Sequence, residues 1–74
     1  MRITVKLFAT LLQGRSREEV REVPPGTQVS SVVEDLHLPR KEIKVILVNS
    51  RHADLSLELS DGDTLALFPV VDGG

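Results

Sequence analysis

The sequence predicts one α+β domain in which a single helix packs against a mixed sheet of four or five strands. Three observations support this prediction. An alternating apolar segment opens the chain, one central segment has the spacing of a helix, and apolar runs separated by turn residues follow it. At 74 residues the chain has room for one domain only. We therefore expect a folded domain at residues 1–70 and a flexible C-terminal tail at residues 71–74.

The first strand is predicted at residues 2–8, where apolar and polar side chains alternate. Such alternation is typical of a strand with one buried face. We expect Ile3, Val5 and Leu7 to face the core. The residues of the opposite face are Arg2, Thr4, Lys6 and Phe8. Residues 9–17 then form a connection with room for one helical turn.

A second, weaker strand is predicted at residues 18–23, and an amphipathic turn of helix is the alternative there. Pro24-Pro25-Gly26 ends this segment, because prolines have no N–H to donate to a strand ladder.

Thr27 follows as the expected N-cap of a short helix. Four apolar residues then recur at i, i+3, i+4 and i+7, the spacing of one buried helical stripe. They are Val29, Val32, Val33 and Leu36. Leu38-Pro39 is expected to end the helix.

The second half of the chain contains further strand signals. Residues 45–48 form a continuous aliphatic run, which is suited to a strand buried on both faces. Asn49-Ser50 turns the chain, and apolar residues alternate with polar ones at 55–59. A strong turn signal at 60–63 precedes a last strand at 64–68. The order of strand, strand, helix and further strands fits the β-grasp (ubiquitin-like) fold, in which the last strand returns beside the first.

Composition argues against several functional classes. The formal net charge is -2, and Phe8 and Phe68 are the only aromatic residues, whereas nucleic-acid binders usually combine a basic stripe with stacking aromatics. No apolar run approaches the ~18 residues of a membrane span, so we expect a cytoplasmic protein without a membrane partner. The chain has no cysteine, which excludes a disulfide, a thiolate zinc site and a cysteine nucleophile.

The sequence does not indicate a conventional active site. His37 and His52, the latter in an expected turn, belong to no ligand or triad spacing, and we interpret both as surface residues. Asp61 and Asp63 flank a glycine, which favours a turn over a metal loop. We therefore expect no bound metal, no bound cofactor and no stand-alone enzymatic activity.

Gly73-Gly74 is the most informative pair in the chain. Glycine has no Cβ, so its backbone can enter a channel in which any side chain would clash. A terminal carboxylate is a poor electrophile until a nucleotide activates it as an acyl-adenylate. A sulfur donor could then convert that group to a thiocarboxylate. The lack of cysteine fits this hypothesis, because the sulfur would be bonded to the carboxyl carbon of Gly74.

Four segments resemble the sulfur carriers of the MoaD/ThiS type, which include the small subunit of molybdopterin synthase and the thiamine sulfur carrier. The segments are residues 5–9, 46–49, 61–63 and 67–74. The resemblance extends over essentially the whole chain. The molybdopterin type usually has a second proline at the position of Val70 and a small uncharged residue at that of Asp72. The long first hairpin resembles the molybdopterin branch, whereas Val70-Val71 is slightly closer to the thiamine type, so the pathway stays open.

The resemblance implies three partners. An E1-like enzyme would use ATP to adenylate Gly74, a sulfurtransferase would thiolate it, and a synthase large subunit or equivalent enzyme would accept the sulfur. A pterin precursor of molybdopterin is the first candidate acceptor and thiamine thiazole the second. A ubiquitin-like modifier joined to lysines through Gly74 is the alternative function. A β-grasp interaction module with an idle tail is a further alternative.

Phe8 and Phe68 are predicted to lie side by side on the sheet face opposite the helix, because each ends a strand and those strands should be parallel neighbours. We expect them to form a partner-binding surface together with the start of the tail. The resemblance implies the same, since family aromatics at these positions face the large subunit. The tail residues of this surface are Pro69, Val70, Val71 and Asp72. A loop containing Leu11-Leu12 that covers the two rings is the alternative.

Overall fold

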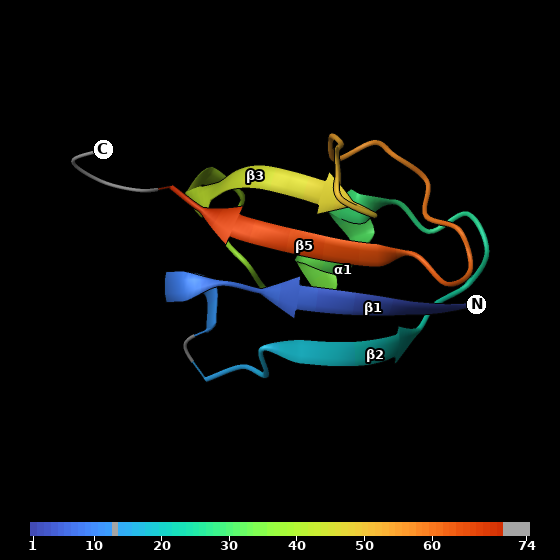
Figure 1. Cartoon of the computed structure of the whole chain (residues 1–74), viewed down its shortest axis with the longest axis horizontal. Helices are drawn as coiled ribbons and strands as arrows, with labels where there is room; N and C mark the ends of the chain where they lie inside the picture. Colours follow the sequence, from blue (N-terminus) through green and yellow to red (C-terminus); the bar gives the residue numbers. More distant parts are fainter. Residues whose placement is uncertain (13, 71–74) are drawn as a thin grey trace.

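The computed structural model describes residues 1–12 and 14–70, so the predicted tail at 71–74 lies outside the described residues. The elements in chain order are β1 (Arg2–Leu7), η1 (Ala9–Leu12), β2 (Glu18–Glu22), α1 (Val29–Asp35), η2 (Arg40–Glu42), β3 (Ile43–Val48), β4 (Arg51–His52) and β5 (Thr64–Pro69). The five strands form one sheet in the order β2-β1-β5-β3-β4 (Figure 1). β1 and β5 are parallel and the other neighbours antiparallel, which confirms the β-grasp topology.

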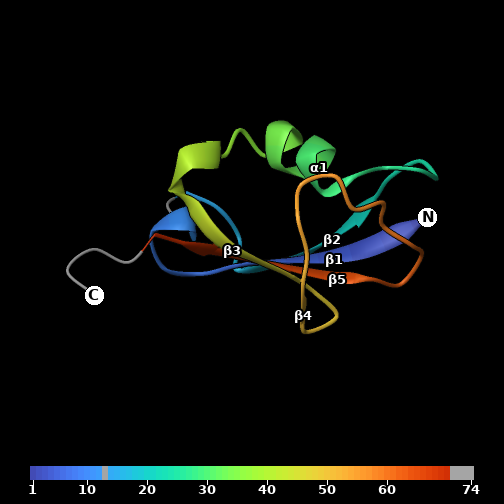
Figure 2. The same cartoon turned by 90° about the horizontal axis from the view of Figure 1, so that it is seen from above.

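The core lies between the sheet and α1, which covers one face of it (Figure 2). The predicted inward residues of β1 are buried and meet those of β5, because Val5 pairs with Leu65 and Leu7 with Leu67. The predicted helical stripe closes the core from above, and its members Val29, Val32 and Val33 are fully buried. No polar side chain is buried among the residues described, so this core is held by apolar packing.

β3 has only one buried face, so the prediction of a strand buried on both faces was wrong. Ile46 packs against the core and Val48 is buried within it. Val45 and Leu47 pair with residues of β5 that point to the other face, and both are only half-buried. The physical reason is that α1 covers one side of the sheet. A continuous aliphatic run therefore leaves apolar side chains on the open face.

Thr27 is not the N-cap of α1, contrary to the prediction. Gln28 occupies that position and makes no side-chain capping bond. The Thr27 hydroxyl instead donates to the carbonyl oxygen of Pro24 at 2.7 Å and so stabilises the preceding turn. A threonine hydroxyl can accept from an N–H of a following helix or donate to a preceding carbonyl, and here it donates to the carbonyl of the proline turn.

Residues 55–59 do not form a strand of the sheet, although their side chains alternate. They make one isolated bridge to the residue before α1. The carbonyl oxygens of Leu57 and Leu55 accept hydrogen bonds from the N–H groups of Val29 and Ser30, at 3.0 and 2.9 Å. This segment thus satisfies N–H groups of the first helical turn that a side-chain cap would otherwise satisfy.

α1 ends before the proline that was expected to stop it. Its C-cap is Leu36, and His37 takes a left-handed conformation with φ of 58°. The N–H of His37 donates to the carbonyl of Glu34, and that of Leu38 donates to the carbonyl of Val33. This is the Schellman arrangement, which usually has glycine at the left-handed position.

β3 and β4 are joined by a two-residue turn in which Asn49 and Ser50 both have positive φ, at 52° and 68°. This is the type I′ conformation that suits a tight hairpin. The hairpin brings His52 opposite Leu47, so His52 lies in a strand and not in the expected turn. Figure 2 shows the hairpin extending from the sheet on the side away from α1.

The predicted turn at Asp61–Asp63 is confirmed, and its carboxylates bond to the backbone. Asp61 accepts a hydrogen bond from the N–H of Arg2 at 2.7 Å, and Asp63 accepts one from the N–H of Ser60 at the same distance. Gly62 has φ of 86° and donates its N–H to the carbonyl of Arg2. The turn therefore fixes the start of β1 beside β5.

Asn49 connects the hairpin to this turn, and we expect Asn49→Ala to lower the free energy of unfolding by about 1–3 kcal/mol. Its side-chain amide donates to Asp63 at 2.8 Å and accepts from the N–H of Thr64 at 3.0 Å. Alanine removes both bonds and also tolerates the positive φ poorly. Asn49→Gly removes only the bonds, so urea denaturation should show a smaller loss for glycine. Equal losses for the two variants would mean that the backbone conformation is not strained by alanine.

Candidate functional site

The two phenylalanines stack against each other at the ends of their strands. Their ring centroids lie 4.3 Å apart and their planes differ by 8°. The parallel register explains this contact, because Leu7 pairs with Leu67 and the next residue of each chain segment is a phenylalanine. Both rings are half-buried. The prediction that Phe8 and Phe68 are neighbours is confirmed.

Around the stacked rings, the open face of the sheet is apolar. We call this surface the aromatic patch; it consists of Phe8, Val45, Leu47, Ala66, Phe68 and Val70. Leu11 is buried in the helix-side core and Leu12 packs against that core, and neither lines the grooves beside the rings. The structure thus favours an open patch over rings covered by this loop. Exposed apolar patches of this kind are typical of partner-binding surfaces.

Two shallow grooves flank Phe68. The tail-side groove has a volume of about 520 Å³ and is lined by Lys44, Val45, Leu47, His52, Phe68, Pro69 and Val70. The hairpin-side groove has a volume of about 430 Å³ and is lined by Lys6, Phe8, Leu47, Asn49, Ser50, Thr64, Ala66 and Phe68. Both grooves are open to solvent, so they suit side chains of a protein partner better than an enclosed small ligand.

The chain is anchored up to the point where the predicted tail begins. Pro69 is buried and pairs with Ile43 of β3. The N–H of Val70 donates to the carbonyl of Glu42 at 2.9 Å, while the residue as a whole remains 47% exposed. The predicted tail residues Val71, Asp72, Gly73 and Gly74 lie outside the described residues.

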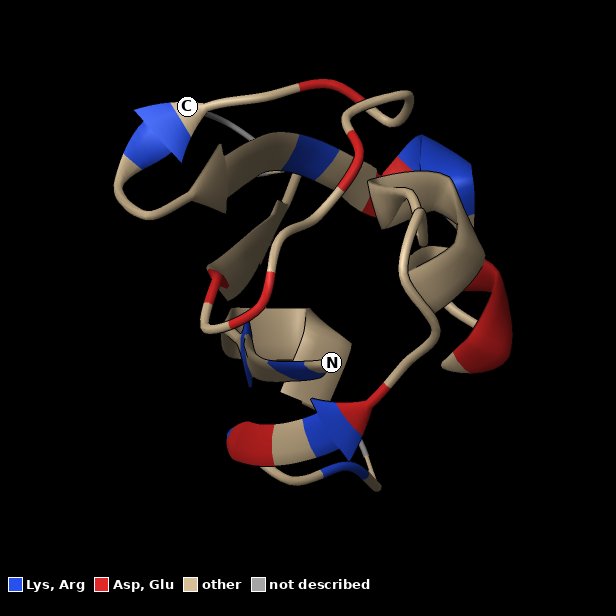
Figure 3. Ribbon diagram, turned by 90° about the vertical axis from the view of Figure 1, so that its right-hand side faces the viewer, with Lys and Arg blue, Asp and Glu red and all other residues tan. Residues whose placement is uncertain are grey.

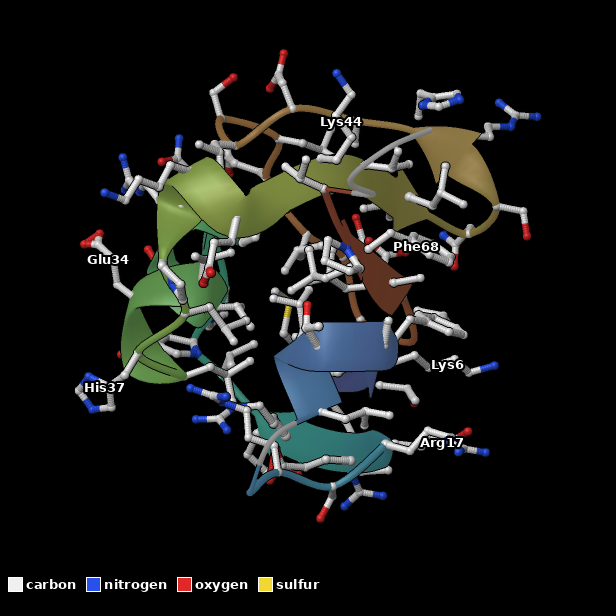
Figure 4. All side chains as sticks on the ribbon, turned by 90° about the vertical axis from the view of Figure 1, so that its left-hand side faces the viewer. Lys6, Arg17, Glu34, His37, Lys44 and Phe68 are labelled. Carbon is white, nitrogen blue, oxygen red and sulfur yellow. The ribbon has the colours of Figure 1, made fainter. Side chains whose placement is uncertain are left out.

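The charged residues around the patch come from different strands. In Figure 4, Lys6, Arg17 and Phe68 lie on one side of the molecule, whereas Glu34 and His37 lie on the opposite side. Lys44 lines the tail-side groove and Lys6 the hairpin-side groove. The patch is therefore an apolar surface with Lys44 and Lys6 at its borders, and Glu18 is the cross-strand neighbour of Lys6.

No acid–base or metal chemistry is indicated for the described part of the chain. The pKa of Asp54 is held below its usual value because the Ser56 hydroxyl and N–H both donate to its carboxylate, at 2.6 and 3.0 Å. This is a local turn on an exposed loop. Residues 1–12 and 14–70 contain no group of His, Asp or Glu side chains arranged to hold a metal ion. No helix in the same residues is long and apolar enough to cross a membrane.

Comparison with known proteins identifies the family. The sequence model of the ThiS family matches residues 5–74. The chain belongs to the ThiS family. No curated protein sequence matches this ThiS-family chain closely. The family and its solved relatives identify the chain as a ubiquitin-like sulfur carrier or modifier.

Three solved structures illustrate the relationship of this ThiS-family chain to others. Molybdopterin converting factor subunit 1 from Pyrococcus furiosus is 30% identical, with a TM-score of 0.76 over 95% of this chain and 98% of that one. Small archaeal modifier protein 1 from Haloferax volcanii is 27% identical, with a TM-score of 0.77 over the same shares. Subunit 1 in the complex of molybdopterin-converting factor subunits 1 and 2 from Helicobacter pylori is 21% identical, with a TM-score of 0.68 over 100% of both chains, which shows the fold alone.

The sequence did not predict every residue that lines the aromatic patch of this ThiS-family chain. Val45, Leu47, Lys44 and His52 line the tail-side groove, but none was predicted as a site residue. The available signal was the aliphatic run of β3 in a chain with a single helix. One helix covers one face of a sheet, so a strand that is apolar on both faces must leave one apolar face open.

Proposed function

We propose that this protein carries sulfur as a thiocarboxylate on Gly74. The observation that supports this most strongly is the ThiS-family match, which continues through residue 74 and so includes Gly73-Gly74. The described part of the domain ends at Val70, which lies beside an apolar surface that suits a protein partner. In this proposal the folded body provides recognition, and the tail from Val71 onward carries the reacting carboxyl group to the partner.

The proposed reaction has two steps on the Gly74 carboxyl group. First, a carboxylate oxygen attacks the α-phosphate of ATP, which forms the acyl-adenylate and releases pyrophosphate. A sulfide equivalent then attacks the acyl carbon, the bond to the phosphate oxygen breaks, and AMP leaves. The carboxyl carbon keeps one oxygen and gains one sulfur. Both steps occur on the partner enzymes, so the chain acts as a carrier and not as a catalyst.

The proposed partners are an E1-like adenylating enzyme, a sulfurtransferase and an acceptor enzyme. ATP binds the adenylating enzyme and not this chain. The acceptor is a synthase large subunit, by analogy with the Helicobacter pylori complex of subunits 1 and 2. A pterin is the preferred sulfur acceptor and thiamine thiazole the second candidate. We place these reactions in the cytoplasm.

We also propose a second candidate function, conjugation of Gly74 to lysines of target proteins. The similarity to small archaeal modifier protein 1, at 27% identity, supports it. The two functions share the adenylated intermediate and differ in the nucleophile that attacks it. A sulfide equivalent gives a thiocarboxylate, whereas a lysine amine gives an isopeptide bond.

Intact-mass spectrometry tests the proposed function. We expect the purified chain, incubated with ATP, the adenylating enzyme and sulfurtransferase of its own organism and a sulfur source, to gain about 16 Da, because one oxygen is replaced by sulfur. Omission of ATP is the control and should leave the mass unchanged. Isopeptide-linked adducts in cells, together with no thiocarboxylate in the reaction, would favour the modifier function instead.

A further inference from the structure

β2 is an outermost strand of the sheet, and one of its two backbone edges has no neighbour among the described residues. It pairs with β1 alone, and Figure 1 shows it along the border of the sheet. Edge strands of natural proteins often carry a proline, a lysine or a bulge, which prevents pairing with another chain. β2 has no proline or lysine, and its register with β1 has no shift. This edge can therefore accept a further strand.

The free backbone groups of β2 belong to alternate residues. At one end of the β1–β2 ladder, Val23 and Met1 exchange two hydrogen bonds of 2.8 Å. Bonded pairs occur at every second position of an antiparallel ladder, so Arg21 and Glu19 also direct their N–H and C=O groups to β1. The corresponding groups of residues 18, 20 and 22 therefore point outward, away from the sheet.

The centre of this edge is apolar. Val20 is 59% exposed, more than the other exposed large hydrophobic residues of the described chain. It pairs with Thr4, so its side chain lies on the open face of the sheet. Figure 3 shows charged residues of both signs along β2, on either side of this uncharged position. A strand that covers this edge would therefore meet an apolar residue at its centre and charges around it.

We propose that two copies of this protein pair through β2, antiparallel and about a two-fold axis at Val20. Residue 20 then faces its own counterpart, and residue 18 of each copy faces residue 22 of the other. All three have outward backbone groups, so the interface contains about six backbone hydrogen bonds, and no other register uses all of these groups. β4 lies at the opposite border of the sheet, so this pairing leaves the tail-side groove uncovered. The inference is independent of the proposed function.

The helix face of β2 is complementary in charge to a second copy in this register. Glu19 and Arg21 lie on that face, because they pair with the inward residues Val5 and Ile3 of β1. Across the two-fold axis, Glu19 of each copy stands opposite Arg21 of the other, at the non-bonded positions where side chains are closest. Within one chain the same two residues already form an ion pair at 3.2 Å. The dimer thus joins two such pairs into one cluster of unlike charges.

The open face of the interface carries a balanced set of charges. Glu18 of one copy stands opposite Glu22 of the other, and these like charges weaken the pairing. Each acid has a cation of its own chain beside it, because Arg2 contacts Glu22 at 3.2 Å and Lys6 is the cross-strand neighbour of Glu18. The edge is therefore not a net acidic strip that would select a basic peptide. A second copy, which matches both its backbone groups and its charges, is the better occupant.

Glu19→Arg and Arg21→Glu test this register by complementation. Each variant alone carries two like charges on the helix face of β2, so it repels its own copy, whereas the two variants mixed again present unlike charges. We expect a wild-type dissociation constant of about 0.1–1 mM, as for a small interface. It should rise about tenfold for each variant alone and return to within about threefold of wild type for the mixture. Sedimentation velocity and NMR titration of one labelled variant with the other measure these constants.

Glu34→Arg and Arg40→Glu are the matched controls. These residues form another exposed ion pair, at 3.3 Å, on α1 and η2, so the substitutions change the net charge equally but away from the edge. Each should leave the dissociation constant within about twofold of wild type. Thermal melts confirm that all four variants are folded.

Hydrogen exchange tests the backbone pairing separately. The amides of residues 18, 20 and 22 should exchange more slowly as the protein concentration rises, because only the dimer bonds them. Those of Glu19 and Arg21 should be protected at every concentration. Val20→Pro removes one outward N–H and no bond to β1, so it should abolish self-association while the fold is kept.

Three outcomes would overturn the proposal. The first is a wild-type chain that stays monomeric up to about 1 mM. The second is a mixture of Glu19→Arg and Arg21→Glu that associates no better than the separate variants, which would exclude this register. The third is concentration-dependent protection of amides in β3 and β5 without protection in β2, which would place self-association elsewhere on the sheet.

Discussion

A chain that lacks Gly74 is expected to lose ATP-dependent thiolation completely while its fold remains intact. In the proposed function the reacting carboxyl carbon belongs to Gly74, and the chain contains no cysteine that could carry the sulfur instead. The core and its hydrogen bonds lie within the described residues, and the hydrogen bond from Val70 to Glu42 anchors the end of β5. Thermal unfolding should therefore be unchanged, and intact-mass spectrometry should show no gain of about 16 Da.

Gly73→Ala extends this test to the shape of the tail. A methyl group at this position would meet the wall of a channel that fits only backbone, and a displacement of about 1 Å can reduce turnover by a factor on the order of 100. Ser31→Ala is the control, because Ser31 is exposed on α1 in the layer opposite the patch. Full thiolation of the chain without Gly74 would refute the assignment, and normal turnover of Gly73→Ala would argue against a narrow channel.

Phe68→Ala is expected to weaken binding to the activating enzyme by about 1–3 kcal/mol, as truncation of a central aromatic anchor does. The ring is half-buried on the open face, separates the two grooves and stacks on Phe8. Loss of that stacking and of the partial burial of the ring should together lower the free energy of unfolding by about 1–2.5 kcal/mol. Titration calorimetry with the activating enzyme measures the first quantity and urea denaturation the second.

The neighbouring residue provides the matched control for Phe68. Leu67 lies in the same strand directly before Phe68, but its side chain points into the core and none of its surface is exposed. Leu67→Ala should therefore destabilise the fold by about 2–5 kcal/mol, as core truncations do. If Phe68→Ala lowers stability by about 3 kcal/mol or more, its ring is a core element and the binding role is wrong.

The sequence by itself determined the elements whose signals are local. Alternation in β1 identified which side chains are buried, because successive strand residues point to opposite faces. The stripe at Val29, Val32 and Val33 identified the buried side of α1. The turn at Asp61–Asp63 was also predictable, since short polar side chains and glycine bend the chain wherever they occur. The contact between Phe8 and Phe68 followed once a parallel pair of first and last strands was assumed.

The tertiary structure alone decided how these elements meet. Capping of α1 by the carbonyls of Leu55 and Leu57 depends on a loop far away in sequence, so Thr27 gave a misleading local signal. Val45 and Leu47 of β3, which are half-buried on the open face, could not be distinguished from core residues by hydropathy. Their exposure depends on which face the single helix covers and on the pairing register with β5. The position of His52 and Lys44 beside Phe68 likewise depends on strand order, a long-range property that no local pattern encodes.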